Sequence, residues 1–94
     1  MKWKDETYSI SQLNLAAFLL VAGHRLLYLK PCESRGHRFA EFIFERDDRI
    51  AEDRMRFYEH QAVVDARKYA ESLVSLKRRA MEKLEENANN EQTG

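Results

Sequence analysis

The fold of this chain is indicated most clearly by residues 9–30, which read SISQLNLAAFLLVAGHRLLYLK. Ser9 and Gln12 have the spacing of a capping box, in which the two side chains bond free backbone N–H groups at the start of a helix. Gly23 follows as the residue that can end this helix with a positive φ. The segment therefore predicts a capped helix, a glycine stop and then a strand from His24 to Lys30.

The predicted helix has almost no polar side. At 100° per residue, apolar side chains between Leu13 and Ala22 occupy nearly all of its faces. A helix of this kind is buried on every side, so we expect it to lie between a sheet and other helices or against a second subunit. It has about half of the ~20 residues that a membrane-spanning helix needs, and we therefore expect no membrane contact.

Two stretches rich in aromatic and branched residues follow the glycine, His24 to Lys30 and Arg38 to Glu45. They predict an antiparallel hairpin with a longer loop, which contains Pro31 to His37. The stretch from Trp3 to Tyr8 could supply a short third strand. Because a two-stranded hairpin is only marginally stable alone, we expect the helices or a second subunit to cover it.

Two C-terminal helices are predicted to pack on this sheet. Asp47 or Asp48 has the position of an N-cap for a helix that runs to about Tyr58. Asp65 has the same position for the last helix, which we expect to end near Glu86. The apolar stripe of this last helix is wide enough for two contacts. It consists of Ala66, Tyr69, Leu73, Leu76 and Ala80, widened by Ala70, Val74, Met81 and Leu84.

These elements together predict one α+β domain over residues 1–86, followed by a disordered polar tail at residues 87–94. The chain has 94 residues, which leaves no room for a second core. Its only cysteine, Cys32, cannot form an internal disulfide, so we expect a reducing, cytoplasmic compartment. The N-terminal residues lack the apolar stretch of a signal peptide.

The sequence holds no pattern that predicts catalysis, a cofactor or a metal site. The motifs GxSxG, HExxH and the P-loop do not occur. His24, Cys32 and His37 carry metal-ligand atoms, but the predicted hairpin holds the two histidines roughly 20 Å apart, too far to share an ion. Cys32 beside His37 could pair a nucleophile with a base, yet no oxyanion-stabilising loop or helix follows. We therefore expect a protein that is not an enzyme.

Two charged residues on apolar helix faces are the first candidates for an interface. Arg54 and Lys77 project into the apolar arcs of their helices. A charge in such a place is paired within the chain, extends to water along its apolar stem, or marks a contact with a partner. With their apolar neighbours, the candidate interface residues are Arg54, Leu73, Lys77, Met81 and Leu84.

A second set of residues predicts contacts with nucleic acid. The formal charge is zero, from 16 basic and 16 acidic residues, which lowers the expectation of bulk phosphate binding. A local basic surface is feasible if the hairpin loop and the last helix share a face. Its residues would be Arg35, Arg38, Lys77, Arg79 and Lys83.

A longer pattern is formed by residues 7–19 (TYSISQLNLAAFL), Gly23, residues 42–45 (FIFE), residues 64–69 (VDARKY), Leu73, Leu76, Lys77 and Arg79. In this order the segments resemble a small family of prokaryotic and phage-associated proteins of unknown function, over about residues 7–80. These motifs are signals of capping and packing. The resemblance implies a small accessory role in a bacterial, phage or mobile-element setting and no established activity.

We expect a non-enzymatic protein–protein interaction or regulatory module, which would act on a host protein if its setting is a phage or mobile element. A homodimer is expected because the first helix is apolar on all sides and the apolar stripe of the last helix is wide. One small subunit does not readily supply enough surface to bury both. No cofactor is expected, and no motif identifies the protein partner. The alternative is a nucleic-acid-binding accessory protein that uses the basic loop and the last helix.

Overall fold

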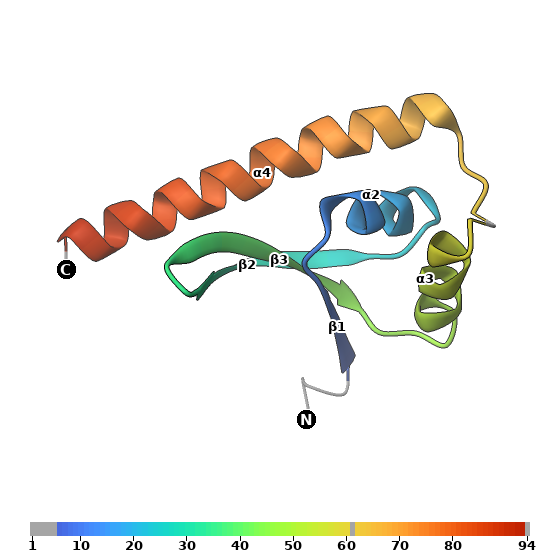
Figure 1. The fold of residues 1–94 in the computed structure, drawn as a ribbon, viewed down its shortest axis with the longest axis horizontal. Coiled ribbons are helices and arrows are strands. Elements are labelled where there is room, and N and C mark those ends of the chain that lie inside the picture. Colours follow the sequence, from blue (N-terminus) through green and yellow to red (C-terminus); the bar gives the residue numbers. More distant parts are fainter. Residues whose placement is uncertain (1–5, 61, 94) are drawn as a thin grey trace.

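The computed structural model describes residues 6–60 and 62–93. This part of the chain contains three strands and three helices in an α+β arrangement, as Figure 1 shows. The elements are β1 (Thr7–Ile10), α2 (Leu13–Val21), β2 (Leu26–Ser34), β3 (His37–Glu45), α3 (Ile50–Tyr58) and α4 (Ala66–Thr93). The predicted α+β class is therefore confirmed. Both C-terminal helices were predicted to pack on the sheet, but only α4 packs on β2 and β3, whereas α3 packs mainly against α2.

The three strands form one antiparallel sheet in the order β1-β3-β2. β1 pairs with the second half of β3, from Thr7 opposite Glu45 to Ile10 opposite Phe42. This is the third strand that the sequence left open, but it lies later than the predicted stretch from Trp3 to Tyr8. Residues 3–5 of that stretch lie outside the described residues.

The hairpin is tighter than the sequence predicted. β2 and β3 are joined by Arg35 and Gly36 alone, and both have positive φ, 53° and 77°. A two-residue turn with positive φ at both positions matches the twist of the strands. The prediction of a long loop from Pro31 to His37 is wrong because β2 is an edge strand, where a proline costs no ladder hydrogen bond on its outer side.

The predicted N-cap of the first helix is also wrong. Ser9 lies in β1 opposite Ile43, and α2 begins only at Leu13. Gln12 takes the N-cap position, and its side chain makes no capping hydrogen bond. The pairing of β1 with β3 holds Ser9 in an extended conformation, which overrides the local capping signal.

The predicted end of this helix is confirmed. Gly23 has a φ of 103°. Its N–H donates to the Leu20 carbonyl at 3.2 Å, and the His24 N–H donates to the Leu19 carbonyl at 3.0 Å. These two bonds form a Schellman motif, which only a residue free to adopt positive φ closes without strain. The turn sends the chain back from α2 into β2.

The core is built around α2. This helix lies between the sheet and the first half of α4, and α3 packs beside it (Figure 1). Residues 15–19 of α2 are all buried, and the Phe18 and Phe57 rings lie 5.5 Å apart. The side chains that are most completely buried are Phe44, Leu15, Leu19, Ile50 and Leu76. Of the two environments predicted for this helix, the structure therefore has the sheet and the other helices of the same chain.

The two C-terminal helices start in different ways. Asp65 caps α4 as predicted, since its Oδ1 accepts from the Lys68 N–H at 3.0 Å. α3 begins at Ile50, and the cap predicted at Asp47 or Asp48 does not form. Instead the Asp47 carboxylate accepts from the Arg49 N–H at 2.9 Å in a turn before the helix.

α4 is longer than predicted. Its 28 residues extend about 42 Å, so its second half passes over the β2–β3 hairpin (Figure 1). Residues 87–93, predicted as a disordered tail, continue the helix. Asn87 and Ala88 are half-buried, and no proline or glycine interrupts the helix before Gly94. None of the helices within residues 6–60 and 62–93 has the length and apolar character to cross a membrane.

The packing of α4 leads to a first prediction. Leu76 is fully buried, so Leu76→Ala should lower the free energy of unfolding by about 2–5 kcal/mol. Ser75→Ala, at the exposed neighbouring position, should change it by less than about 0.5 kcal/mol. Urea unfolding followed by circular dichroism measures both. Equal effects of the two variants would mean that α4 does not pack as described.

Candidate interaction surfaces

The outward face of α4 carries exposed apolar side chains. Val74 and Met81 are 62% and 56% exposed, and they lie two helical turns apart on the same side. Lys77 lies between them. The shallow hollow along this face is lined by Val74, Lys77, Arg78, Met81, Glu82 and Glu85. We call this set the α4 outer face.

The charges of the α4 outer face are unevenly distributed along the helix. Lys77 and Arg78 lie toward its N-terminal end, and Glu82 and Glu85 lie toward its C-terminal end. Met81 lies between the basic pair and the acidic pair. The face therefore combines exposed apolar side chains with basic residues toward one end and acidic residues toward the other. A partner whose charges run in the opposite direction would be complementary to it.

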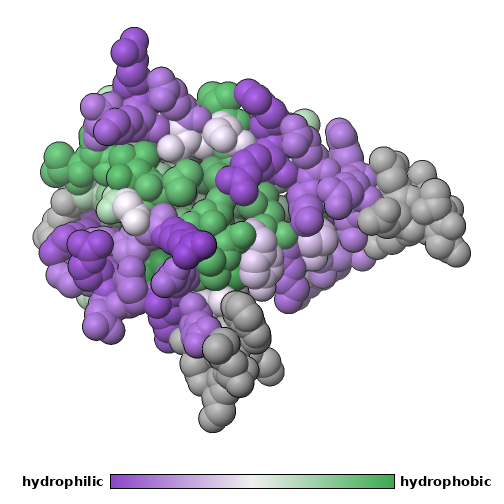
Figure 2. All heavy atoms as spheres, turned by 180° about the vertical axis from the view of Figure 1, so that it is seen from behind, coloured by the Kyte–Doolittle hydropathy of each residue, from purple (hydrophilic) through white to green (hydrophobic). Residues whose placement is uncertain are grey.

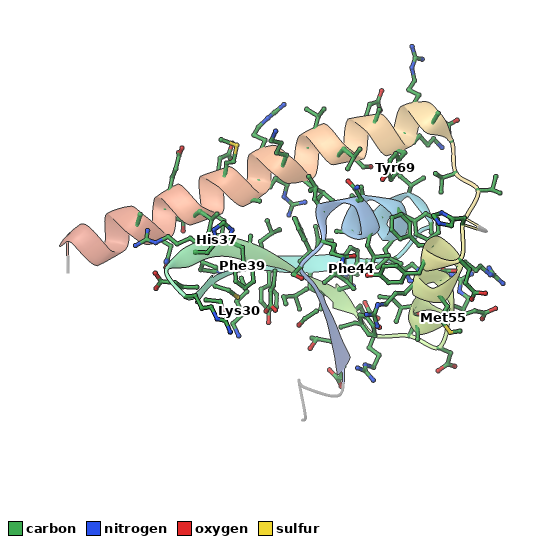
Figure 3. All side chains as sticks on the ribbon, in the orientation of Figure 1. Lys30, His37, Phe39, Phe44, Met55 and Tyr69 are labelled. Carbon is green, nitrogen blue, oxygen red and sulfur yellow. The ribbon has the colours of Figure 1, made fainter. Side chains whose placement is uncertain are left out.

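The five predicted interface residues do not form one surface. Lys77 and Met81 belong to the α4 outer face. Leu73 is half-buried against the core, and Leu84 is half-buried. The stripe that the sequence suggested is thus divided, with its Leu76 side packed on the core and its Val74 side exposed. Figure 3 shows Tyr69 on the side of α4 that faces α2.

Arg54 is paired within the chain, one of the outcomes predicted for it. Its Nη1 donates to the Tyr8 hydroxyl at 3.0 Å, and its guanidinium carbon lies 5.5 Å from the centre of the Tyr58 ring. The hydrogen bond to Tyr8, followed by that to Tyr58, raises the pKa of Arg54 above its ordinary value. Arg54 is therefore a charged link between α3 and β1 and lies on an element that takes no part in the α4 outer face.

The predicted nucleic-acid contacts are separated as well. Arg79 and Lys83 line a groove of about 300 Å³ between α4 and β2, together with Glu82 and Glu86. The rest of its lining is Leu27, Tyr28 and Leu29. β2 is an edge strand of the sheet. Figure 2 shows the back of the molecule, where hydrophobic residues gather at the centre between hydrophilic ones. Leucines and interleaved carboxylates are unfavourable for a phosphate backbone.

The other basic residues of that set lie elsewhere. Arg35 is in the turn of the hairpin, and Arg38 follows at the start of β3, opposite Glu33. Lys77 belongs to the α4 outer face, on a different side of the helix from Arg79 and Lys83. In Figure 3, Lys30 extends from the hairpin on the side away from α4, and His37 lies near the helix. The structure thus distributes the basic residues over three places.

A buried histidine is the feature that the sequence did not predict. His24 is the one polar or charged residue that is buried within the described part of the chain. Its Nε2 lies 2.6 Å from Oδ2 of Asp53, and its Nδ1 lies 3.3 Å from Oδ2 of Asp47. Because ionised carboxylates only accept, both contacts are hydrogen bonds at once when the ring carries two N–H groups. His24 thereby ties the turn after α2 to α3 and the segment before it.

The pKa of the Asp47 carboxyl is shifted by its surroundings. Desolvation alone would raise its pKa, but the N–H of Arg49 and the ring of His24 together lower the pKa below the ordinary value of 3.8. Sequence pattern gave little sign of this arrangement, since Asp47 and Asp53 are six residues apart and lie on different sides of the α3 start. The Schellman turn at Gly23 is what places His24 between them.

The thiol of Cys32 has an environment that disfavours reactivity. Partial desolvation and the side chain of Glu41 raise its pKa above the ordinary value of 9.0. Since the thiolate is the nucleophile, a raised pKa keeps the group inert at neutral pH. Over residues 6–60 and 62–93, no group of three or more His, Cys, Asp or Glu residues is placed to hold a metal ion.

Comparison of the chain with protein-family models, with curated proteins and with solved structures gave no match. The resemblance over residues 7–80 to a prokaryotic and phage-associated family therefore stays a prediction. Function has to be inferred from the surfaces of this chain itself.

The buried histidine leads to a second prediction. Asp53→Ala removes the short acceptor of the His24 ring and should lower the free energy of unfolding by about 1–3 kcal/mol at neutral pH. Asp48→Ala is the matched control, because Asp48 is exposed and makes no side-chain hydrogen bond within the described residues. Its effect should stay below about 0.5 kcal/mol. Similar values for the two variants in urea unfolding would contradict a structural role of the cluster.

The pKa of Asp47 gives a third prediction. Because this pKa is lower in the folded chain than the ordinary 3.8, ionisation of Asp47 favours folding above pH 3.8. The contribution is lost as the pH falls through the lower, folded-state value. The stability difference between the wild type and Asp47→Asn should therefore be positive at pH 7 and shrink toward pH ~2.5. A difference that grows on acidification would contradict the direction of the shift.

Proposed function

We propose that this chain is a non-enzymatic protein-interaction module that acts as a homodimer, with the α4 outer face as the contact between the two copies. The proposal is carried by one observation, the exposure of Val74 and Met81 on one side of a helix that is longer than its own core requires. Aligned apolar residues with charged neighbours are the pattern of a helix that pairs with another helix.

The charges of the face favour a second copy in antiparallel orientation. Lys77 lies four residues before Met81 and Glu85 lies four residues after it. If two α4 helices cross with Met81 near the two-fold axis, Lys77 of each copy lies opposite Glu85 of the other. A two-fold interface presents the same surface on both subunits, so such self-complementarity is what it requires. Exposed ion pairs contribute at most about 1 kcal/mol each, and their main effect is to set the orientation.

The biological role that accompanies this dimer is regulatory in our proposal. The setting is a reducing cytoplasm, in keeping with a single cysteine, Cys32. Action on a host protein in a phage or mobile-element setting rests on the resemblance over residues 7–80 alone. Nucleic-acid binding is the second candidate of the sequence, and it has less support because its basic residues are divided among separate surfaces.

The dimer gives the fourth prediction. Size-exclusion chromatography with light scattering should give about twice the 11.2 kDa chain mass for the wild type. Met81→Glu places a carboxylate on the axis beside that of the other copy, and should yield a monomer with unchanged circular dichroism. Met55→Glu is the matched control, because Met55 is 61% exposed on α3, away from the proposed interface (Figure 3). This variant should remain dimeric.

Two results would contradict the proposal. A wild-type chain that stays monomeric at every concentration would exclude the homodimer, and a Met81→Glu variant that stays dimeric would place the interface elsewhere. The salt dependence of binding distinguishes the nucleic-acid alternative from the homodimer. Binding of duplex DNA that weakens steeply with salt and is lost in the double variant Arg79→Glu, Lys83→Glu would favour that alternative.

A further inference from the structure

A further hollow lies where β1, the start of α2, the residue after β3 and α3 meet. Its volume is about 310 Å³. The polar groups that line it include Tyr8, Gln12, Arg46, Arg54 and Tyr58. The elements that contribute them can be followed in Figure 1. None of its lining residues belongs to α4, so this site is independent of the proposed dimer.

Although Glu6 and Glu45 line a neighbouring hollow together with Arg46, the lining of this hollow carries only positive charge. Arg46 and Arg54 both line it, and its lining contains neither aspartate nor glutamate. Within the described residues neither arginine is in an ion pair with a carboxylate. Two other arginines, by contrast, form ion pairs with glutamates. Arg25 lies 3.7 Å from Glu45, and Arg56 lies 2.8 Å from Glu52.

The two guanidinium groups are held in place by one tyrosine. The guanidinium carbon of Arg46 lies 5.4 Å from the centre of the Tyr8 ring, and Nη1 of Arg54 donates to the Tyr8 hydroxyl at 3.0 Å. The Nε of Arg46 donates to the Thr7 carbonyl at 3.3 Å. These contacts use only some of the N–H groups of each arginine, and a guanidinium carries five. The other N–H groups of the two guanidiniums are held in place by these contacts, and the lining of the hollow offers them no carboxylate.

Further donors surround the arginines. The Tyr58 hydroxyl donates to Oε1 of Gln12 at 2.5 Å, which leaves the amide NH₂ of Gln12 free to donate. Ser9 and Ser11 add two hydroxyl groups to the lining. The first turn of α2 adjoins the hollow without a side-chain cap, and the positive end of its dipole adds to the field of the arginines. Donors thus converge here from β1, the residues before α2, the residue after β3, and α3.

We propose that this hollow is a binding site for the phosphate group of a small phosphorylated molecule. Two guanidinium groups from different elements can bond several oxygens at once, and a phosphate monoester offers three oxygens and a charge of about −1.5 to −2. A carboxylate has two oxygens and one charge, and would use fewer of the donors. The volume is within the range of small-molecule pockets, so it has room for an organic group attached to the phosphate. Ile10 and Leu15 supply an apolar wall for that group.

The experiment is a titration of the ¹⁵N-labelled full chain with phenyl phosphate, followed by amide resonances, with inorganic phosphate and benzoate as comparison probes. Phenyl phosphate should cause saturable shifts at residues 8–12, Arg46 and Tyr58. Arg54→Gln and Arg46→Gln should each weaken binding by about tenfold or more, because each removes a charged donor. Arg56→Gln is the matched control, since Arg56 lies on the same helix but is paired with Glu52. It should change the affinity less than about twofold.

Each other outcome would overturn the proposal. Absence of saturable shifts at millimolar phenyl phosphate would exclude the site. Benzoate binding as tightly as phenyl phosphate would make it a carboxylate site instead. Equal loss of affinity in Arg56→Gln would show that the overall charge attracts the anion, with no defined pocket. The use of two arginine variants on different elements keeps the test valid if one of them disturbs the fold, which the amide spectrum reports directly.

Discussion

The apolar surface of α2 has to be removed from water on every side, and the rest of the structure is arranged to do this. The sheet covers one side, α4 the opposite side, and α3 packs beside it. Full burial of each large apolar side chain contributes roughly 1.5–3 kcal/mol, so the buried run from Leu15 to Leu19 accounts for a large part of the core. The Gly23 turn ends the helix, and the contact of the buried His24 with the partly buried Asp53 fixes α3 to that turn.

Since one chain covers α2 by itself, the surfaces left over are those available for function. α2 is nine residues long and spans about 14 Å, whereas the 28 residues of α4 span about 42 Å. Most of α4 is therefore not needed to cover α2. Its outer face and the arginine-lined hollow at the start of α2 lie on different elements, and the two can operate without competing for residues.

Local signals predicted the parts of this fold that depend on local chemistry. The glycine stop at Gly23, the cap at Asp65 and the burial of Leu15 to Leu19 in α2 followed from spacing and periodicity alone. The errors came where pairing across the sheet decided the conformation, as it does for Ser9 in β1 and for Pro31 in β2. The candidate sites were predicted less well for the same reason. Arg54 was a candidate because it lies in an apolar arc of its helix, but Arg46 comes close to it only through the register of β1 on β3. His24 contacts its two carboxylates only because of the Schellman turn.

The division between core and interface requires that α2 is covered within a single chain. Hydrogen exchange of the α2 amides, measured by NMR or mass spectrometry over a wide range of protein concentration, tests it directly. We expect the amides of Leu15 to Leu19 to be among the slowest to exchange, with the same protection in dilute and concentrated samples. If their protection falls on dilution while the strands keep theirs, α2 depends on a second subunit for its burial, and the division between core and interface proposed for this molecule is wrong.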